Sequence, residues 1–167
     1  MPEKDTLFKS KMKHGGVFSF KDFYIFCYNW LKDETGLIIT EKKYIEKIAG
    51  DKKIIEVKWE CYRKLTDYFK FELEVKIKAD PLFKATITQD GAQVETNKGT
   101  VEVEIKGVLV RDYQGKFEMS ATQKFMRSIY EKWVVPSRID QFEDKVTGDC
   151  DEFLGQAKAW LDLEGKR

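Results

Sequence analysis

Alternation of apolar and charged residues in the middle of the chain constrains the fold more than any other feature of the sequence. The odd positions of residues 55–61 are apolar, whereas the even positions from Glu56 to Glu60 are charged. The same alternation recurs over residues 69–77 and 101–105. Successive side chains of a β-strand point to opposite faces of a sheet. The pattern therefore predicts antiparallel strands with one buried face and one solvated face.

Turn signals divide this region into short strands. Asp90-Gly91 is typical of a two-residue hairpin turn, because both central residues of a type I′ turn need positive φ. We expect a further reversal at residues 97–99 and a β-bulge at Gly107, where the alternation changes phase. The result is an antiparallel meander of six strands, expected at residues 37–48, 55–61, 69–77, 85–88, 92–95 and 101–110.

Charge favours one register between the strands at 55–61 and 69–77. A turn centred on Thr66 places Lys58 opposite Glu74, whereas a shift of the register places Lys58 opposite Lys76. Like charges directly opposite each other are destabilising. We therefore expect the register that pairs Lys58 with Glu74.

Helical spacing of apolar residues flanks the predicted sheet. Residues 19–34 carry one apolar face, and Ser19 is the expected N-cap. Beyond Lys116 the helical period returns, and Pro136 and Gly148 divide it into three expected helices. Their ranges are 125–133, 137–148 and 149–161. We expect the N-terminal helix and the three C-terminal helices to pack on one face of the sheet, which gives a two-layer α+β fold.

The pattern predicts a single α+β domain over residues 19–164, preceded by a flexible basic segment at residues 1–18. The chain has 30 Lys+Arg against 29 Asp+Glu, a net charge of +1, and this balance gives no argument for an anionic partner. It contains no apolar run of about 18 residues, the length that a membrane span needs. Residues 1–18 lack the apolar core of a signal peptide, so we expect a cytoplasmic protein.

No residue pattern predicts catalysis, a metal or a cofactor. Histidine occurs once, at His14, which leaves little room for proton transfer or metal binding. The three cysteines, Cys27, Cys61 and Cys150, are far apart and fit neither a zinc site nor a disulfide framework. Cys150 lies near an expected helix N-terminus, which lowers the pKa of a thiol, but Asp149 next to it opposes that effect. We expect no catalytic residue.

Large aromatic side chains suggest one kind of binding site. Aromatic residues make up 14% of the chain, and those expected to point between sheet and helices are Trp59, Phe71, Tyr130, Trp133 and Trp160. They either fill the core or enclose a cavity for a small hydrophobic ligand. The leading hypothesis is therefore a small non-catalytic intracellular binding or adaptor domain, which holds such a ligand or docks a protein partner.

The alternative hypothesis is a nucleic-acid-associated accessory protein. Its expected contacts are the basic N-terminal segment, with Lys9, Lys11 and Lys13, and a lysine cluster near a hairpin tip. That cluster is Lys42, Lys43, Lys47, Lys52 and Lys53. Phosphate binding of useful affinity needs more contacts than the three N-terminal lysines supply, so nucleic acid is not the expected partner. The open edges of a meander also make homodimerisation through a sheet edge plausible.

Overall fold

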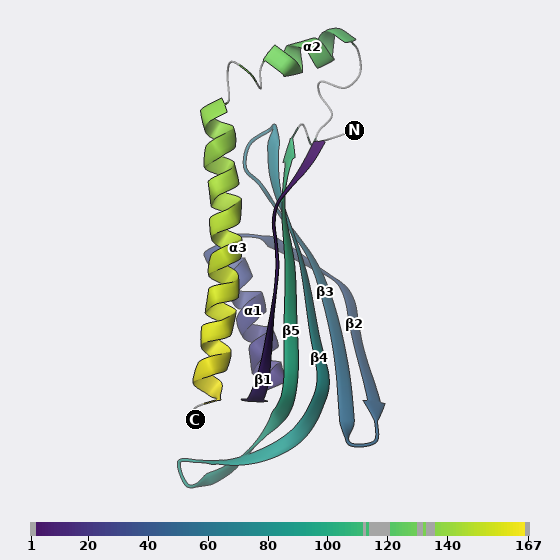
Figure 1. The fold of residues 1–167 in the computed structure, drawn as a ribbon, viewed down its shortest axis with the longest axis vertical. Helices are drawn as coiled ribbons and strands as arrows, with labels where there is room; N and C mark the ends of the chain where they lie inside the picture. Colours follow the sequence, from purple (N-terminus) through teal and green to yellow (C-terminus); the bar gives the residue numbers. More distant parts are fainter. Residues whose placement is uncertain (1–2, 112, 114–120, 130–131, 133–135, 166–167) are drawn as a thin grey trace.

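An antiparallel sheet, covered on one face by two helices, forms the body of the protein in the computed structural model (Figure 1). The structure describes residues 3–111, 113, 121–129, 132 and 136–165. In chain order the elements are β1 (Glu3–Phe18), α1 (Phe20–Glu34), β2 (Ile38–Ala49), β3 (Lys52–Lys64), β4 (Phe69–Gln89), β5 (Ala92–Arg111), α2 (Ala121–Ile129) and α3 (Pro136–Glu164). None of these helices is both long and apolar enough to cross a membrane.

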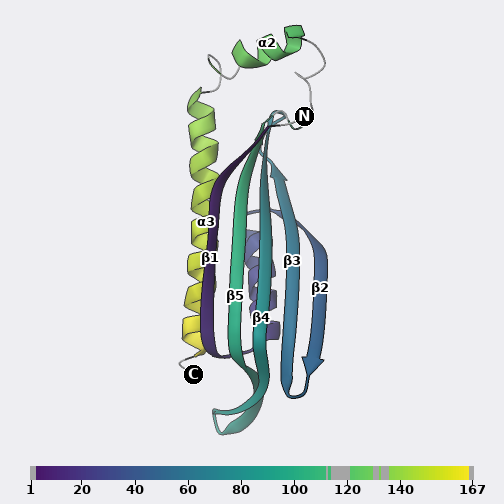
Figure 2. The ribbon, with the colours of Figure 1, turned by 45° about the vertical axis from the view of Figure 1, so that its right-hand side comes forward.

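The first and last strands of the chain are neighbours in the sheet. The strand order is β1-β5-β4-β3-β2, so β1 and β2 form the two edges. Figure 2 shows the exposed face of the sheet, with α1 and α3 behind it. The α+β class and the antiparallel sheet agree with the sequence pattern, whereas the number and order of the elements differ from it.

The N-terminal segment is the first difference. Residues 1–18 were expected to be flexible, but Glu3–Phe18 form the edge strand β1, which pairs along its length with β5. The inward-facing side chains of β1 include Ser10, Met12 and His14, which are not uniformly apolar. The alternation that reveals a half-buried strand is therefore weak here, and the strand depends on its hydrogen bonds to β5.

The described part of the chain has five strands rather than six, because two pairs of expected strands are continuous and β1 is added. The expected strands at 69–77 and 85–88 are one strand, β4, and the reversal expected at 97–99 does not occur. Strand β4 instead shifts register between Ala79 and Leu82. Gly99 of β5 allows this irregularity, because a Cβ at Gly99 would collide with the backbone of β4. The Asp90-Gly91 turn is confirmed, with φ of 51° and 80°.

The expected register between β3 and β4 is wrong. Lys58 lies opposite Lys76. The turn between the two strands has its own hydrogen bonds in the observed register. The Thr66 hydroxyl oxygen accepts hydrogen bonds of 3.1 and 3.0 Å from the backbone N–H groups two and three residues later. The repulsion between Lys58 and Lys76 is offset by a carboxylate, because Lys76 also lies opposite Glu104 of β5. The bulge expected at Gly107 is found instead in β1, opposite this glycine, between Thr6 and Phe8.

The C-terminal region contains fewer helices than expected. Gly148 does not end a helix, and α3 runs unbroken from Pro136 to Glu164. Its apolar face continues in phase across this glycine, from Val146 through Cys150 to Leu161, all of them fully buried. A continuous buried face outweighs the helix propensity of one glycine, which costs about 1 kcal/mol. The described chain thus has three helices instead of four.

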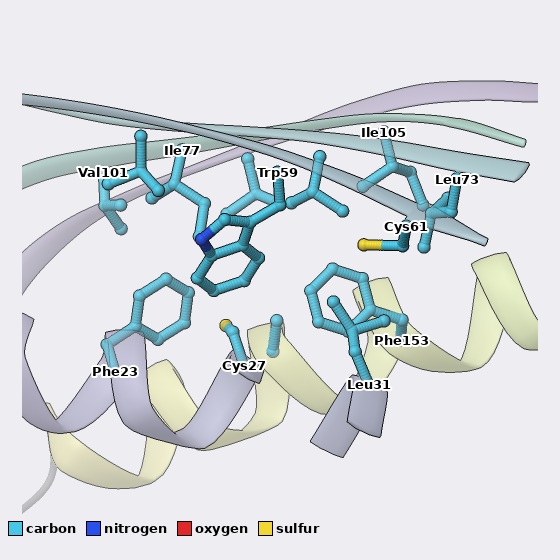
Figure 3. Packing of buried hydrophobic residues seen from close by; sticks show 14 of the residues in the cluster. Phe23, Cys27, Leu31, Trp59, Cys61, Leu73, Ile77, Val101, Ile105 and Phe153 are labelled. Atoms are coloured by element: carbon cyan, nitrogen blue, oxygen red, sulfur yellow. The ribbon is translucent and has the colours of Figure 1, made fainter. Parts of the chain in front are cut away.

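Apolar side chains between the helices and the inner face of the sheet form the core (Figure 3). Helix α1 begins as predicted at Ser19, whose hydroxyl oxygen accepts a hydrogen bond from the Asp22 N–H at 3.3 Å. Trp59 of β3 is completely buried and points toward the helices. Directly paired residues share a face, so the residues that alternate with this core must point to the opposite, solvated face.

Candidate functional site

Lysines outnumber glutamates on the solvated face of the sheet. We define the outer surface as the outward-facing residues of segments 4–13, 42–47, 56–60, 70–78 and 102–106. Its lysines are Lys4, Lys9, Lys11, Lys13, Lys42, Lys43, Lys47, Lys58, Lys70, Lys76, Lys78 and Lys106. Its acidic residues are Glu56, Glu60, Glu72, Glu74, Glu102 and Glu104. The outer surface therefore carries about twice as many positive as negative charges.

The excess positive charge lies at the two edges of the sheet. Strand β1 contributes the β1 row, which consists of Lys4, Lys9, Lys11 and Lys13. Strand β2 contributes the β2 row, which consists of Lys42, Lys43 and Lys47. Neither strand contributes an acidic residue to the outer surface. All the glutamates belong to the three central strands, where they slightly outnumber the lysines.

Ion pairs link the lysine rows to the central strands. The shortest are Lys11–Glu102 and Lys43–Glu56, each 2.8 Å between nitrogen and oxygen. The hydrogen bond from Lys43 and its charge lower the pKa of Glu56, and the carboxylate of Glu102 raises the pKa of Lys11. Since each carboxylate carries a single negative charge, these pairs cannot neutralise the whole excess of lysine.

The helical layer has the opposite charge. Along α3, eight acidic residues accompany only three basic ones, Arg138, Lys145 and Lys158. The net charge of +1 therefore results from two oppositely charged faces. An anionic partner would therefore meet a positively charged sheet face, in spite of the nearly neutral whole chain.

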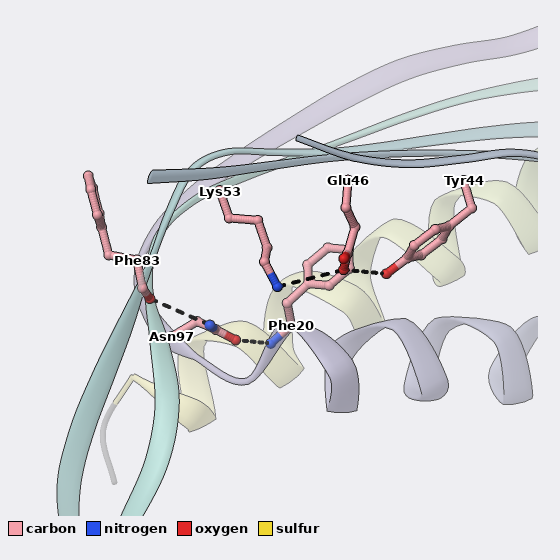
Figure 4. A network of polar contacts seen from close by, with 6 residues as sticks. All are labelled: Phe20, Tyr44, Glu46, Lys53, Phe83 and Asn97. Carbon is pink, nitrogen blue, oxygen red and sulfur yellow. Dashed lines mark hydrogen bonds and ion pairs between the residues drawn. The ribbon is translucent and has the colours of Figure 1, made fainter. Parts of the chain in front are cut away.

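The structure divides the lysine cluster predicted at the hairpin tip. Lys42, Lys43 and Lys47 belong to the outer surface, whereas Lys52 forms a 3.0 Å ion pair with Asp80. Lys53 points to the helical side of the sheet, where it lies 3.7 Å from Glu46 (Figure 4).

The predicted N-terminal lysines join the outer surface at the other edge of the sheet. Lys9, Lys11 and Lys13 lie on β1, across the sheet from the β2 row. Sequence reasoning missed that these lysines share a face with Lys42, Lys43 and Lys47. It also treated the lysines of the central strands only as a solvated row. The alternation of lysine at residues 9, 11 and 13 was the available signal, whereas the register shifts in β1 and β2 place Lys4 and Lys42 out of phase with their neighbouring lysines.

Three of the five predicted aromatic site residues lie in the described part of the chain, where they pack in or against the core. Trp59 packs against Tyr24 and Tyr28, with ring centroids 5.2 and 5.7 Å away. Phe71 is buried, and Trp160 of α3 stacks on Phe26 at 5.8 Å. The other two, at positions 130 and 133, lie outside the described residues.

A groove of about 520 Å³ separates α1 from the ends of β2 and β3. Its apolar lining is formed by Phe20, Tyr24, Tyr44, Ile55 and Leu82. Figure 4 shows part of the polar network around it, in which the hydroxyl of Tyr44 donates to Glu46 at 3.0 Å. Sequence reasoning missed this groove, because a register shift in β2 between Glu41 and Lys43 changes which residues face α1.

Two tyrosines of this groove hold their protons unusually strongly. The hydroxyl of Tyr24 donates a 2.6 Å hydrogen bond to Glu41. Partial burial, together with this carboxylate, raises the pKa of Tyr24 to about 12. Burial and the carboxylate of Glu46 likewise raise the pKa of Tyr44 to about 12. Both phenols are therefore neutral donors at ordinary pH.

The cysteines do not offer a reactive thiolate. Cys27, Cys61 and Cys150 are all buried. Burial raises the pKa of Cys61 and of Cys150 to about 12 and raises that of Cys27 as well. Among the described residues, no group of three or more His, Cys, Asp and Glu side chains is placed to hold a metal ion.

Comparison with protein-family models gives no match for this sequence, and comparison with curated proteins gives none either. The charge distribution and the groove are therefore the grounds on which a function can be proposed.

Proposed function

We propose that this is a small binding protein whose outer surface binds a polyanion, and that this polyanion is nucleic acid. The observation that carries this proposal is the segregation of charge, with lysine rows on both edges of the sheet and an acidic helix on the other side. Phosphate contacts from lysine and arginine release counterions from nucleic acid and supply most of its non-specific binding energy. Binding rather than catalysis suits these exposed lysines and the buried, protonated thiols.

The spacing of the β1 row explains why a polyanion would stabilise it. Alternate residues of a strand lie about 7 Å apart on one face, so Lys9, Lys11 and Lys13 repel one another. A chain of phosphates relieves this repulsion. The ion pairs already present do not prevent such binding, because exposed pairs contribute only about 0–1 kcal/mol.

Fluorescence anisotropy with a labelled DNA duplex of about two helical turns, roughly 20 base pairs, tests the proposal. We expect a dissociation constant of roughly 10⁻⁴ to 10⁻⁶ M at physiological salt and much tighter binding at about 50 mM salt. The triple variant K9Q/K11Q/K13Q should bind more weakly. The control K145Q/K158Q, which changes lysines of α3, should bind as the wild type does. Absence of binding at low salt would contradict the proposal.

A second candidate function is suggested by the groove beside α1, which lies between sheet and helix. Its apolar lining, with Phe20 and Leu82, and its polar rim, with Glu41 and Lys53, are typical of a small-ligand site. Native mass spectrometry of protein purified gently from its own cells tests this candidate. A reproducible excess mass that disappears on denaturation supports a bound ligand, and its loss in the variant Tyr44→Ala would place the ligand in the groove. A mass equal to that of the bare chain contradicts this candidate.

A further inference from the structure

Building on the proposed function, we infer that the partner is double-stranded nucleic acid, bound through both of its phosphate backbones and without readout of its bases. The inference depends on three properties of the outer surface. These are the separation of the two lysine rows, the kinds of side chain between them, and the charge of the central strands.

The two lysine rows are too far apart for one strand of nucleic acid. Strands β1 and β2 are separated by β5, β4 and β3, and four inter-strand spacings place the rows about 19 Å apart. A single strand can follow only one of these rows. A duplex presents two backbones on either side of a groove, and the major groove of B-DNA is about 12 Å wide. The rows are about 7 Å further apart than this groove is wide, a difference that the flexible four-carbon stems of the lysines can span, so a duplex can lie on the sheet with one backbone near each row.

The outer surface lacks the side chains that read bases. Proteins that bind single strands stack the bases on aromatic rings, and base edges are most often read by the planar fork of arginine. The outer surface contains no arginine, and the one outward-facing ring that borders it is Tyr62 of β3, which lies opposite Glu72. The nearest ring along β3, that of Tyr62, is covered by Lys70, whose Nζ lies 4.8 Å from the ring centroid. Lysine acts as a point charge, which suits phosphate but does not discriminate between bases.

The central strands favour a duplex over a continuous anionic surface. Within the outer surface, β3, β4 and β5 contribute six glutamates and five lysines, so the centre of this surface lacks the positive excess of its edges. A flat anionic membrane would touch these glutamates as well as the lysine rows. Two backbones separated by a groove meet the lysine rows and leave the glutamates beneath the groove. The pattern of charge therefore fits the duplex better than a lipid surface.

The test compares probes and variants in one anisotropy experiment. The probes are two DNA duplexes of unrelated sequence, their separated strands, and vesicles containing phosphatidylserine. The variants are K9Q/K11Q/K13Q in the β1 row, K42Q/K43Q/K47Q in the β2 row, and the control K145Q/K158Q on α3. Circular dichroism and thermal unfolding confirm that each variant is folded before its binding is measured.

We expect the two duplexes to bind equally well and more tightly than either single strand. Each row variant should make the negative slope of log K against log salt shallower by about 3 units, because each loses three phosphate contacts at about 0.9 unit apiece. The losses of the two rows should add when the variants are combined.

Four results would contradict these expectations. Tighter binding of a single strand, or an effect of only one row on the duplex, overturns the duplex inference while the proposed function stands. Binding to vesicles without binding to the duplexes overturns the inference and replaces nucleic acid with a lipid surface as the polyanion. Failure of every nucleic acid to bind at about 50 mM salt rejects the proposed function too.

Discussion

The thiol of Cys150 on α3 lies directly over Gly107 of β5, so close that a Cβ at Gly107 would come within 2.6 Å of the sulfur. The same Cβ would lie 3.2 Å from a methyl group of Val146. The long helix therefore rests on the sheet at a position without a side chain. This close approach is what allows Val146 and Cys150 to be fully buried.

The substitution Gly107→Ala tests this contact. The new methyl group overpacks the interface between α3 and β5, and overpacking of a core typically costs about 1–3 kcal/mol. We expect the free energy of unfolding, measured by urea denaturation, to fall by that amount.

The matched control for this prediction is Gly148→Ala, because Gly148 is an exposed position of the same helix with no atom within 4 Å of an added Cβ. The free energy of unfolding of this control should rise by up to about 1 kcal/mol, since alanine is the better helix former. Removal of the Cys150 sulfur in the double variant G107A/C150A should recover part of the loss. Equal stability of Gly107→Ala and the wild type would refute the close contact.

A second prediction concerns the reactivity of the thiols. Burial raises the pKa of Cys61 and Cys150 to about 12, and only the thiolate is nucleophilic. In the native protein at about pH 8, Ellman's reagent should therefore find no rapidly reacting cysteine. After denaturation in guanidinium all three cysteines should react. One equivalent that reacts rapidly in the folded protein would show that one of these thiols is accessible.

A third prediction concerns Arg111, at the end of β5. Its guanidinium lies 2.7 Å from the carboxylate of Asp5 on β1 and 3.8 Å from that of Glu143 on α3. The substitution Arg111→Ala leaves a buried carboxylate oxygen of Asp5 without a positive partner, which should cost about 1–3 kcal/mol in urea denaturation. The control Lys43→Ala breaks an ion pair that is more exposed, and it should leave the urea midpoint close to that of the wild type. Equal effects of the two substitutions would argue against a structural role of Arg111.

A fourth prediction follows from the tyrosines of the groove. The pKa of Tyr24 and of Tyr44 is about 12 in the folded protein, compared with about 10 in an unfolded chain. Between these values the unfolded chain releases the phenolic protons first. The free energy of unfolding should therefore fall as the pH rises from about 10 toward 12. The variant Y24F/Y44F should show a shallower fall in urea denaturation across this range, and the same slope as the wild type would contradict the prediction.

The alternating pattern predicted the sheet well where strands are half-buried and ended by strong turns. Asp90-Gly91 forms the expected turn because its backbone requirement is local. The continuation of β4 and β5 past the expected reversal at 97–99 was not predictable, since it depends on the close approach at Gly99 to another strand. The unbroken α3 was missed because Gly148 was given more weight than the apolar face that continues across it.

The candidate surface was predictable only in its components. The lysines of residues 9–13 and those at 42–47 were recognised, but the sequence did not reveal that they form opposite edges of one face. That relation depends on the pairing of β1 with β5, the first strand with the last. Weak alternation in β1 hid this strand. The excess of lysine over glutamate on one face therefore follows only from the order of the strands in the sheet.

The most direct test of the central claim is lysine footprinting of the protein with and without a DNA duplex. Each lysine is acetylated at low salt, and its rate of modification is read by mass spectrometry. We expect the duplex to slow modification of Lys9, Lys11 and Lys13 and also of Lys43 and Lys47, on both edges of the outer surface. The lysines of α3, Lys145 and Lys158, should react at unchanged rates. Protection of the α3 lysines instead, or equal protection of lysines on both faces, would contradict the assignment of the outer surface as the binding site.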